Sequence, residues 1–285
     1  DILDHAREFA KLYGDKYVNA PEEERRKALV DYALPLNIAA LERDLGRYRI
    51  HYDVWFRESV LHREGKVTAI CEKLKENGWA YEKEGALWYN NIKMMIEKAE
   101  KAGKPLSEAE IAELKDDVLV RANGVPTYFA ADIAYHYNKF AERGFHRVIN
   151  IWGADHHGHV ARLKGAMDAV GLDGDKLDIV LMQLVRLMKD GQPYRMSKRS
   201  GRAVTLTDLL DDVPIDAARF FFNMREPNAT FDFDLDLAVQ QSSENPVYYV
   251  QYAHARICSV LKLVMAEGLT EEDIKNADLG LLTTP

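Results

Sequence analysis

The segment from residue 191 to 201 combines the side chains that bind a polyphosphate. Two glycines enclose three cations and two serine hydroxyls, Arg195, Lys198, Arg199, Ser197 and Ser200. Charge-assisted hydrogen bonds from these cations would hold phosphate oxygens, and the glycines allow the backbone conformations that a closing loop needs. A solvated basic turn is the alternative that charge alone leaves open. The order of the residues favours the anion-binding loop.

A second group of reactive side chains lies at residues 153–159, where an aspartate and three histidines occupy five consecutive positions. A metal site is one hypothesis, since imidazole and carboxylate bind transition metals. However, His156 and His159 would share one helix face while His157 points elsewhere, and no thiol or distant carboxylate completes a ligand set. We favour a nucleotide site, in which Gly153 lets a ribose or adenine approach the backbone and Asp155 accepts from hydroxyls.

Tyr128 and Asp132 lie four residues apart on a predicted helix and therefore share one face. A buried tyrosine bonded to a carboxylate one turn away is a common structural pair, and this alternative stays open. The functional hypothesis is a site for a planar cation, with the charge from Asp132 and the ring or hydroxyl from Tyr128. Glu58 would add a second carboxylate, so the group suits a guanidinium.

These candidate residues need a framework that brings them together. Apolar, β-branched runs at 147–152 and 178–185, separated by a helix from about 157 to 170, predict a parallel sheet covered by helices on both faces. Ligands bind beyond the carboxyl ends of such strands, so we expect segments 153–156 and 191–201 on one side of the sheet.

Further elements surround this sheet. The patterns predict a first helix that ends near residue 13, then a helix from about 22 to 45 with an interruption near Pro35, a strand at 50–56, a helix at 65–77, a hairpin at 79–89, an exposed helical insert at about 90–114, a strand at 118–120 and a helix at 127–141. Near the other end they predict helices at 207–210, 216–222 and 245–266. The last helix carries Tyr248, Gln251 and Arg256, which either pack or contact RNA by stacking and pairing.

Composition limits the class of protein. A net charge of −8 over 285 residues argues against nucleic-acid binding by bulk charge, so RNA contacts would need a local basic surface. Cys71 and Cys258 are far apart and in no metal-ligand spacing, which indicates reduced thiols in a cytoplasmic protein. No apolar run approaches the roughly 20 residues of a membrane span, so we expect a soluble protein without membrane contact.

Several motifs together resemble one family. The run Arg-Met-Ser-Lys at 195–198 resembles the Lys-Met-Ser-Lys loop of class I aminoacyl-tRNA synthetases, with Arg195 in place of the first lysine. The stretches that resemble arginyl-tRNA synthetases in particular are 128–136, 153–159, 216–222, 231–236 and 245–256.

The resemblance implies that ATP, as its Mg²⁺ complex, activates L-arginine to arginyl-adenylate, and that the arginyl group passes to tRNA(Arg). Carried over by match, the catalytic residues are Lys198 and Arg195. The residues implied for ATP are Gly153, Asp155, His156, His159, Met196, Ser197 and Lys198. Those implied for arginine are Glu58, Tyr128, Asp132 and His156, and those for tRNA are Tyr248, Gln251 and Arg256. No tightly bound metal is expected.

The resemblance also implies a domain order. We expect an α/β, Rossmann-like catalytic portion at 1–205 with the insert at about 90–114, a linking stem-contact region at 206–240, and the start of an α-helical anticodon-binding domain at 241–285. The family's other signature, His-Ile-Gly-His or a variant, would lie upstream of Asp1, so we expect this chain alone to be inactive. The alternatives are another class I synthetase and a non-catalytic nucleotide- or RNA-binding module.

Overall fold

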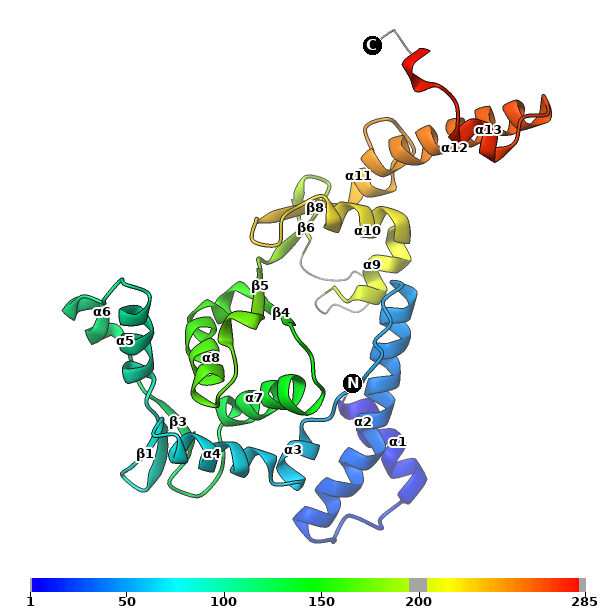
Figure 1. Ribbon diagram of the computed structural model, residues 1–285. Helices are drawn as coiled ribbons and strands as arrows, with labels where there is room; N and C mark the ends of the chain where they lie inside the picture. The colour runs from blue at the N-terminus through cyan, green and yellow to red at the C-terminus, as the bar shows by residue number, and fades with distance from the viewer. Residues whose placement is uncertain (1, 195–203, 282–285) are drawn as a thin grey trace. The chain divides into compact units, whose positions relative to one another are not determined.

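The computed structural model describes residues 2–194 and 204–281 (Figure 1). Its contacts divide the chain into two compact units. Unit 1 comprises Asp1–Tyr52, Arg186–Arg225 and Asp232–Pro285, and unit 2 comprises Asp53–Val185 and Glu226–Phe231.

Unit 2 contains a three-stranded antiparallel sheet, a pair of parallel strands and the helices that connect them. In chain order its elements are α3 (Ser59–Arg63), α4 (Lys66–Glu76), β1 (Ala80–Lys83), β2 (Ala86–Tyr89), α5 (Asn91–Lys101), α6 (Glu108–Glu113), β3 (Asp117–Val120), α7 (Tyr128–Tyr137), a π-helical turn (Asn138–Glu142), β4 (Val148–Gly153), a 3-10 turn (Ala154–His156), α8 (His157–Ala169), a second 3-10 turn (Gly174–Lys176) and β5 (Leu177–Met182).

Strands β4 and β5 run parallel, in register from Val148 opposite Leu177 to Gly153 opposite Met182, and α8 connects them. The predicted parallel pair is therefore confirmed. Its predicted burial on both faces is wrong for the described residues, because Ile149 and Ile151 are 62% and 68% exposed. Side chains alternate along a strand, and only the face that bears Val148 reaches the core.

The predicted hairpin at 79–89 is confirmed, and β3 extends it to a three-stranded antiparallel sheet. Its turn places Glu84 and Gly85 at φ values of 55° and 75°, the left-handed conformation that two-residue hairpin turns require. The strand predicted at 50–56 is wrong, because this stretch forms no ladder with any described strand. An aromatic, β-branched sequence favours a strand only where a neighbour accepts its backbone hydrogen bonds.

The insert at 90–114 is helical as predicted, and Ser107 and Glu110 form the expected capping box of α6. Its predicted exposure is wrong for α5, which packs against α8 with Met94 buried. Gly165 of α8 permits this approach, since a Cβ there would lie 2.7 Å from Met95 Cε. The apolar face of α5 thus packs against α8, a contact that the composition of the insert does not predict.

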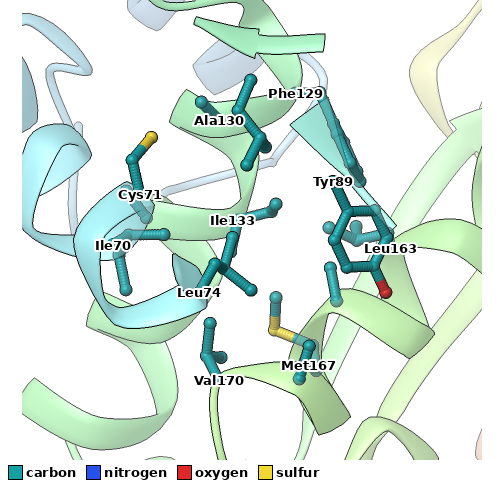
Figure 2. Packing of buried hydrophobic residues seen from close by; sticks show 14 of the residues in the cluster. Ile70, Cys71, Leu74, Tyr89, Phe129, Ala130, Ile133, Leu163, Met167 and Val170 are labelled. Carbon is teal, nitrogen blue, oxygen red and sulfur yellow. The ribbon is translucent and has the colours of Figure 1, made fainter. Parts of the chain in front are cut away.

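Helices α4, α7 and α8 and strand β2 enclose the main hydrophobic core (Figure 2). Leu74, Ile133, Leu163 and Met167 are fully buried there, and Tyr89 lies beside Leu163. The thiol in this core is free, as expected, and burial raises the pKa of Cys71 to about 11. The core therefore fixes α7 and α8 relative to each other.

The Tyr89→Phe substitution is expected to leave the protein equally stable or to raise its free energy of unfolding by about 1 kcal/mol. The Tyr89 hydroxyl is buried without a hydrogen-bond partner among the described residues, and burial raises its pKa. Chemical denaturation checks the result, with Tyr81→Phe as the matched control. The Tyr81 hydroxyl donates to Asp116 at 2.7 Å, so its loss should lower stability by about 1 kcal/mol. Equal losses in both variants would contradict the prediction.

Unit 1 is mainly helical. Its elements are α1 (Ile2–Tyr13), α2 (Glu22–Arg47), β6 (Val185–Lys189), β7 (Gln192–Pro193), α9 (Leu206–Asp212), α10 (Ile215–Asn223), β8 (Phe231–Asp234), α11 (Leu235–Val239), α12 (Pro246–Ala266), α13 (Glu271–Lys275) and a 3-10 turn (Leu279–Leu281), with β6 and β8 each sharing one residue with unit 2. The predicted helices are confirmed, but α2 runs through Pro35 without the expected interruption. No helix in the described residues is long and apolar enough to cross a membrane.

The segment after residue 191 follows a different element from the one expected. β6 and β7 pair antiparallel, Met188 opposite Pro193 and Lys189 opposite Gln192, so a tight hairpin separates the segment from β5. The expectation that this segment begins just beyond the carboxyl end of a parallel strand is therefore wrong. Arg195, Met196, Ser197 and Lys198 lie outside the described residues.

Candidate functional site

A cavity of about 390 Å³ opens in unit 2 between α7, the end of β4 and the start of α8. We call it the Asp132 cavity. It is lined by Tyr128, Phe129, Asp132, Tyr135, His136, Lys139, Asn150, Trp152, His156, His159 and Arg162.

The local sequence explains why these side chains converge. The Thr127 side chain caps α7 by accepting from the backbone N–H of Ala130, which fixes where the helix begins. Tyr128 and Asp132 then lie one turn apart on the same face. On the facing element, His156 and His159 are three residues apart where the chain turns from β4 into α8. The structure thus brings these two motifs together at one cavity.

Four charged or polar side chains form a continuous chain of hydrogen bonds at one wall. His159 Nε2 lies 3.2 Å from Asp132 Oδ2. Arg162 Nε donates to His159 Nδ1 at 2.5 Å, and Arg162 Nη1 donates to Asp117 Oδ1 at 2.5 Å. Burial raises the pKa of the Asp117 carboxyl, and the nearby Arg162 charge opposes that rise. We call this chain the Asp117–Arg162 network.

A second chain of bonds lies behind the Asp132 backbone. Asn150 Nδ2 donates to His136 Nε2 at 2.7 Å, so His136 Nδ1 carries the proton that it donates to the Asp132 carbonyl, also at 2.7 Å. Lys139 Nζ lies 3.4 Å from Asn150 Oδ1 and 4.1 Å from the centre of the Tyr135 ring. Burial lowers the pKa of Lys139 to about 8, and the Asp132 carboxylate opposes this shift. The cavity therefore holds a cation that loses its charge as the pH rises through about 8.

Aromatic rings support the polar groups. The Trp152 ring lies 5.3 Å from the His159 ring, and Phe129 lies 5.4 Å from it on another side. The Arg162 guanidinium also lies over Phe129, at 5.3 Å. Tyr128, by contrast, is 83% exposed, so the alternative of a buried Tyr128–Asp132 pair is wrong. The tyrosine ring is instead accessible at the mouth of the cavity.

Other predicted site residues lie outside the lining. Gly153 and Asp155 stand at the end of β4, where a Cβ on Gly153 would come within 2.5 Å of Asp155 Oδ1. Glu58 occupies the N-cap position of α3 without a side-chain cap bond, and it does not line the Asp132 cavity. Its Oε1 lies 3.6 Å from His62 Nε2. Conversely, sequence reasoning missed Arg162, although its position three residues after His159 placed both on one helix face.

The predicted RNA-contacting residues all lie on α12 of unit 1. Tyr248 and Gln251 line a separate cavity of about 280 Å³. Gln251 Nε2 lies 3.4 Å from Asp216 Oδ2, and Arg256 Nη1 donates to the Tyr252 hydroxyl at 3.0 Å. Among the described residues, no group of three His, Cys, Asp or Glu side chains converges as a metal ion would need.

Comparison with known proteins identifies the family. The family model described as "tRNA synthetases class I (R), catalytic domain" matches residues 4–258. The chain belongs to this family. The arginine–tRNA ligase of Caldanaerobacter subterraneus subsp. tengcongensis is 56% identical over 282 residues, which cover 99% of this chain and 47% of the relative. The arginine–tRNA ligase of Ruminiclostridium cellulolyticum is 52% identical over 285 residues, or 48% of its length.

Solved structures agree with this membership of the class I arginine synthetase family. A Campylobacter jejuni protein described as a candidate arginyl-tRNA synthetase has a TM-score of 0.78 and 34% identity, and the match covers 97% of this chain and 55% of that one. The arginyl-tRNA synthetase of Thermus thermophilus shares the fold, with a TM-score of 0.68 at 20% identity over 96% of this chain and 54% of that one. The chain spans about half the length of the curated relatives it matches.

Proposed function

We propose that this chain corresponds to about half of an arginine–tRNA ligase, which activates L-arginine with ATP and transfers the arginyl group to tRNA(Arg). The relatives that it matches at 52–56% identity are arginine–tRNA ligases, which supports the reaction and the amino acid. We expect the whole protein to be soluble and cytoplasmic, because translation takes place in the cytoplasm.

The observation that carries the proposal is the placement of Asp132 in an aromatic-walled cavity. Its side chain is 42% exposed, and its Oδ1 receives no hydrogen bond from any described residue. A substrate guanidinium would find there a carboxylate oxygen to accept its N–H groups and, in Tyr128, an accessible ring. An uncharged amino acid would desolvate this carboxylate and leave Oδ1 without a hydrogen-bond donor, which is unfavourable.

The nucleotide would bind next to this cavity, at the carboxyl end of β4. Gly153 would allow the ribose or adenine to approach the backbone, and Asp155 and His156 would offer polar contacts. The arginine carboxylate then attacks the α-phosphorus of ATP, and pyrophosphate leaves with the electron pair. Lys198 and Arg195 are proposed to stabilise the negative charge that grows on the phosphates. The Mg²⁺ ion would enter with ATP as part of the substrate.

Contact with tRNA(Arg) is proposed for α12, through Tyr248, Gln251 and Arg256. The helix is largely exposed and presents several tyrosines, among them Tyr249 at 61%. Aromatic rings and arginine stack on unpaired bases, so such a face is suited to RNA.

Calorimetric titration of the 285-residue chain with L-arginine, ATP and tRNA(Arg) tests the proposal. We expect L-arginine to bind, and L-citrulline, which has nearly the same shape without the positive charge, to bind at least about tenfold more weakly. Retained tRNA affinity with no binding of arginine or ATP would instead support a non-catalytic RNA-binding module. Equal binding of arginine and citrulline would reject a charge-selective site.

L-Arginine is expected to bind about fivefold more tightly at pH 9 than at pH 7. The pKa of Lys139 is about 8, so this side chain is charged at pH 7 and mostly neutral at pH 9. Loss of a positive charge near Asp132 removes repulsion of the substrate guanidinium. Calorimetric dissociation constants across this range check the prediction.

The matched control is Lys139→Met, which removes the titrating charge and retains an apolar stem of similar length. Titration of the α-amino group of L-arginine affects both proteins equally, so the comparison isolates Lys139. The variant should bind L-arginine more tightly than the unchanged chain at pH 7 and equally at pH 9. The same pH dependence in both proteins would contradict the role of Lys139.

A further inference from the structure

The direction of the hydrogen bonds in the Asp117–Arg162 network fixes the state of His159. A guanidinium only donates, so the bond from Arg162 Nε at 2.5 Å makes His159 Nδ1 an acceptor. The imidazole proton must then be on Nε2, where it is donated to Asp132 Oδ2 at 3.2 Å. His159 is 12% exposed in its side chain, so water offers little competition for either nitrogen. The network therefore specifies a neutral imidazole of one tautomer.

A neutral His159 matters for the charge of the cavity. If both nitrogens carried protons, His159 and Asp132 would form an ion pair with no net charge, and the attraction for a cationic ligand would fall. The Arg162 charge is itself matched by Asp117 at 2.5 Å. The two pairs together leave one negative charge, on Asp132, and Lys139 adds a positive charge to the same cavity at pH 7.

Arg162 could also compete with the substrate for Asp132. It lines the Asp132 cavity and carries the same guanidinium group as the proposed substrate. A free Arg162 could pair with Asp132 itself and fill the place of the ligand. Asp117 comes from β3, in the separate antiparallel sheet, and its side chain is only 18% exposed. This carboxylate competes with Asp132 for Arg162 and holds the guanidinium at the cavity wall.

We propose that Asp117 and Arg162 are positioning residues that keep Asp132 available to an external guanidinium. Asp117 holds Arg162 away from Asp132, and Arg162, in that position, fixes His159 as the neutral donor to Asp132 Oδ2. The proposal rests on the proposed function in one respect, that the ligand of the cavity is L-arginine. It assigns a role in substrate binding to Asp117 and Arg162, although neither residue needs to contact a substrate atom.

The first test needs no ligand. Imidazole ¹⁵N NMR of the unchanged chain, assigned with a His159→Gln variant, should show a neutral His159 ring with the proton on Nε2 near pH 7. Arg162→Met removes the donor to His159 Nδ1, so the Nε2–H tautomer of His159 should no longer dominate. A doubly protonated ring or an Nδ1–H tautomer in the unchanged chain would overturn the proposal.

The second test uses L-arginine affinity. Asp117→Asn should weaken arginine binding about tenfold, because it frees Arg162 to pair with Asp132, and ATP affinity should not change. Adding Arg162→Met to Asp117→Asn should then recover affinity by severalfold, since the internal competitor is gone. A merely structural role for Asp117 predicts that the second substitution gives no recovery, and this result would overturn the proposal.

Asp116→Asn is the matched control. Asp116 is the neighbouring carboxylate, but it accepts from Tyr81 and from the Ile92 backbone at 2.7 and 2.9 Å and is not part of the network. It should lower stability without altering the His159 tautomer or the arginine affinity. If the unchanged chain binds no L-arginine, the proposed function fails, and the NMR result still decides whether the network sets the state of His159.

Discussion

The Asp132→Asn variant is expected to bind L-arginine about 30- to 150-fold more weakly than the unchanged chain, equivalent to about 2–3 kcal/mol. The substitution removes the negative charge that we propose pairs with the guanidinium. The asparagine carbonyl can still accept from His159 Nε2, which lies 3.2 Å from the present carboxylate, so the cavity wall should keep its shape. The amide N–H₂ would then face the ligand as a donor and oppose a donor-only guanidinium. Calorimetric dissociation constants for L-arginine measure the effect.

The same variant should lose its preference for L-arginine over L-citrulline, because the preference depends on charge. Asp175→Asn is the matched control, since Asp175 is 82% exposed and lies outside the cavity lining. It should leave the affinity for L-arginine within about twofold. An arginine dissociation constant in Asp132→Asn within threefold of the unchanged value would reject Asp132 as the guanidinium partner.

Short-range patterns in the sequence predicted the helices around this cavity where one helix carries two of its lining residues. The spacing of Tyr128 and Asp132 placed both on α7, and His159 was expected in the helix that starts near residue 157, as the structure confirms. The N-terminal cap of α6 was predicted for the same reason, because the capping box of Ser107 and Glu110 depends on residues only three apart. Such features need no knowledge of the rest of the chain.

Contacts between distant segments could not be predicted in the same way. Asp117 on β3 and Arg162 on α8 are 45 residues apart, and they meet because the fold brings this strand and this helix together. Lys139 reads as a surface cation in the sequence, but the turn after α7 half-buries it beside Asn150. Glu58 does not line the Asp132 cavity, and the strand expected before it does not form. A single sequence carries no signal for which elements become neighbours.

Successive turns of α8 have different surroundings. His159 and Arg162, in the first two turns, line the Asp132 cavity, whereas Leu163, Ala166 and Met167, further along the helix, are buried in the core (Figure 2). We therefore expect that stability and ligand affinity can be changed separately. This separation provides a test of whether the core or the polar network positions the site.

The Leu163→Ala variant is expected to lower the free energy of unfolding by about 2–5 kcal/mol, because the removed atoms leave a cavity among fully buried neighbours. Denaturant unfolding monitored by circular dichroism measures the loss. Leu163→Met is the matched control and should cost less than about 1.5 kcal/mol, since a side chain of similar volume refills the space. Under conditions in which Leu163→Ala remains folded, its L-arginine affinity should stay within about threefold, because Asp132, His159 and Arg162 keep their hydrogen bonds. A loss of affinity as large as that of Asp132→Asn would mean that core packing, and not the Asp117–Arg162 network, holds the cavity in its binding geometry.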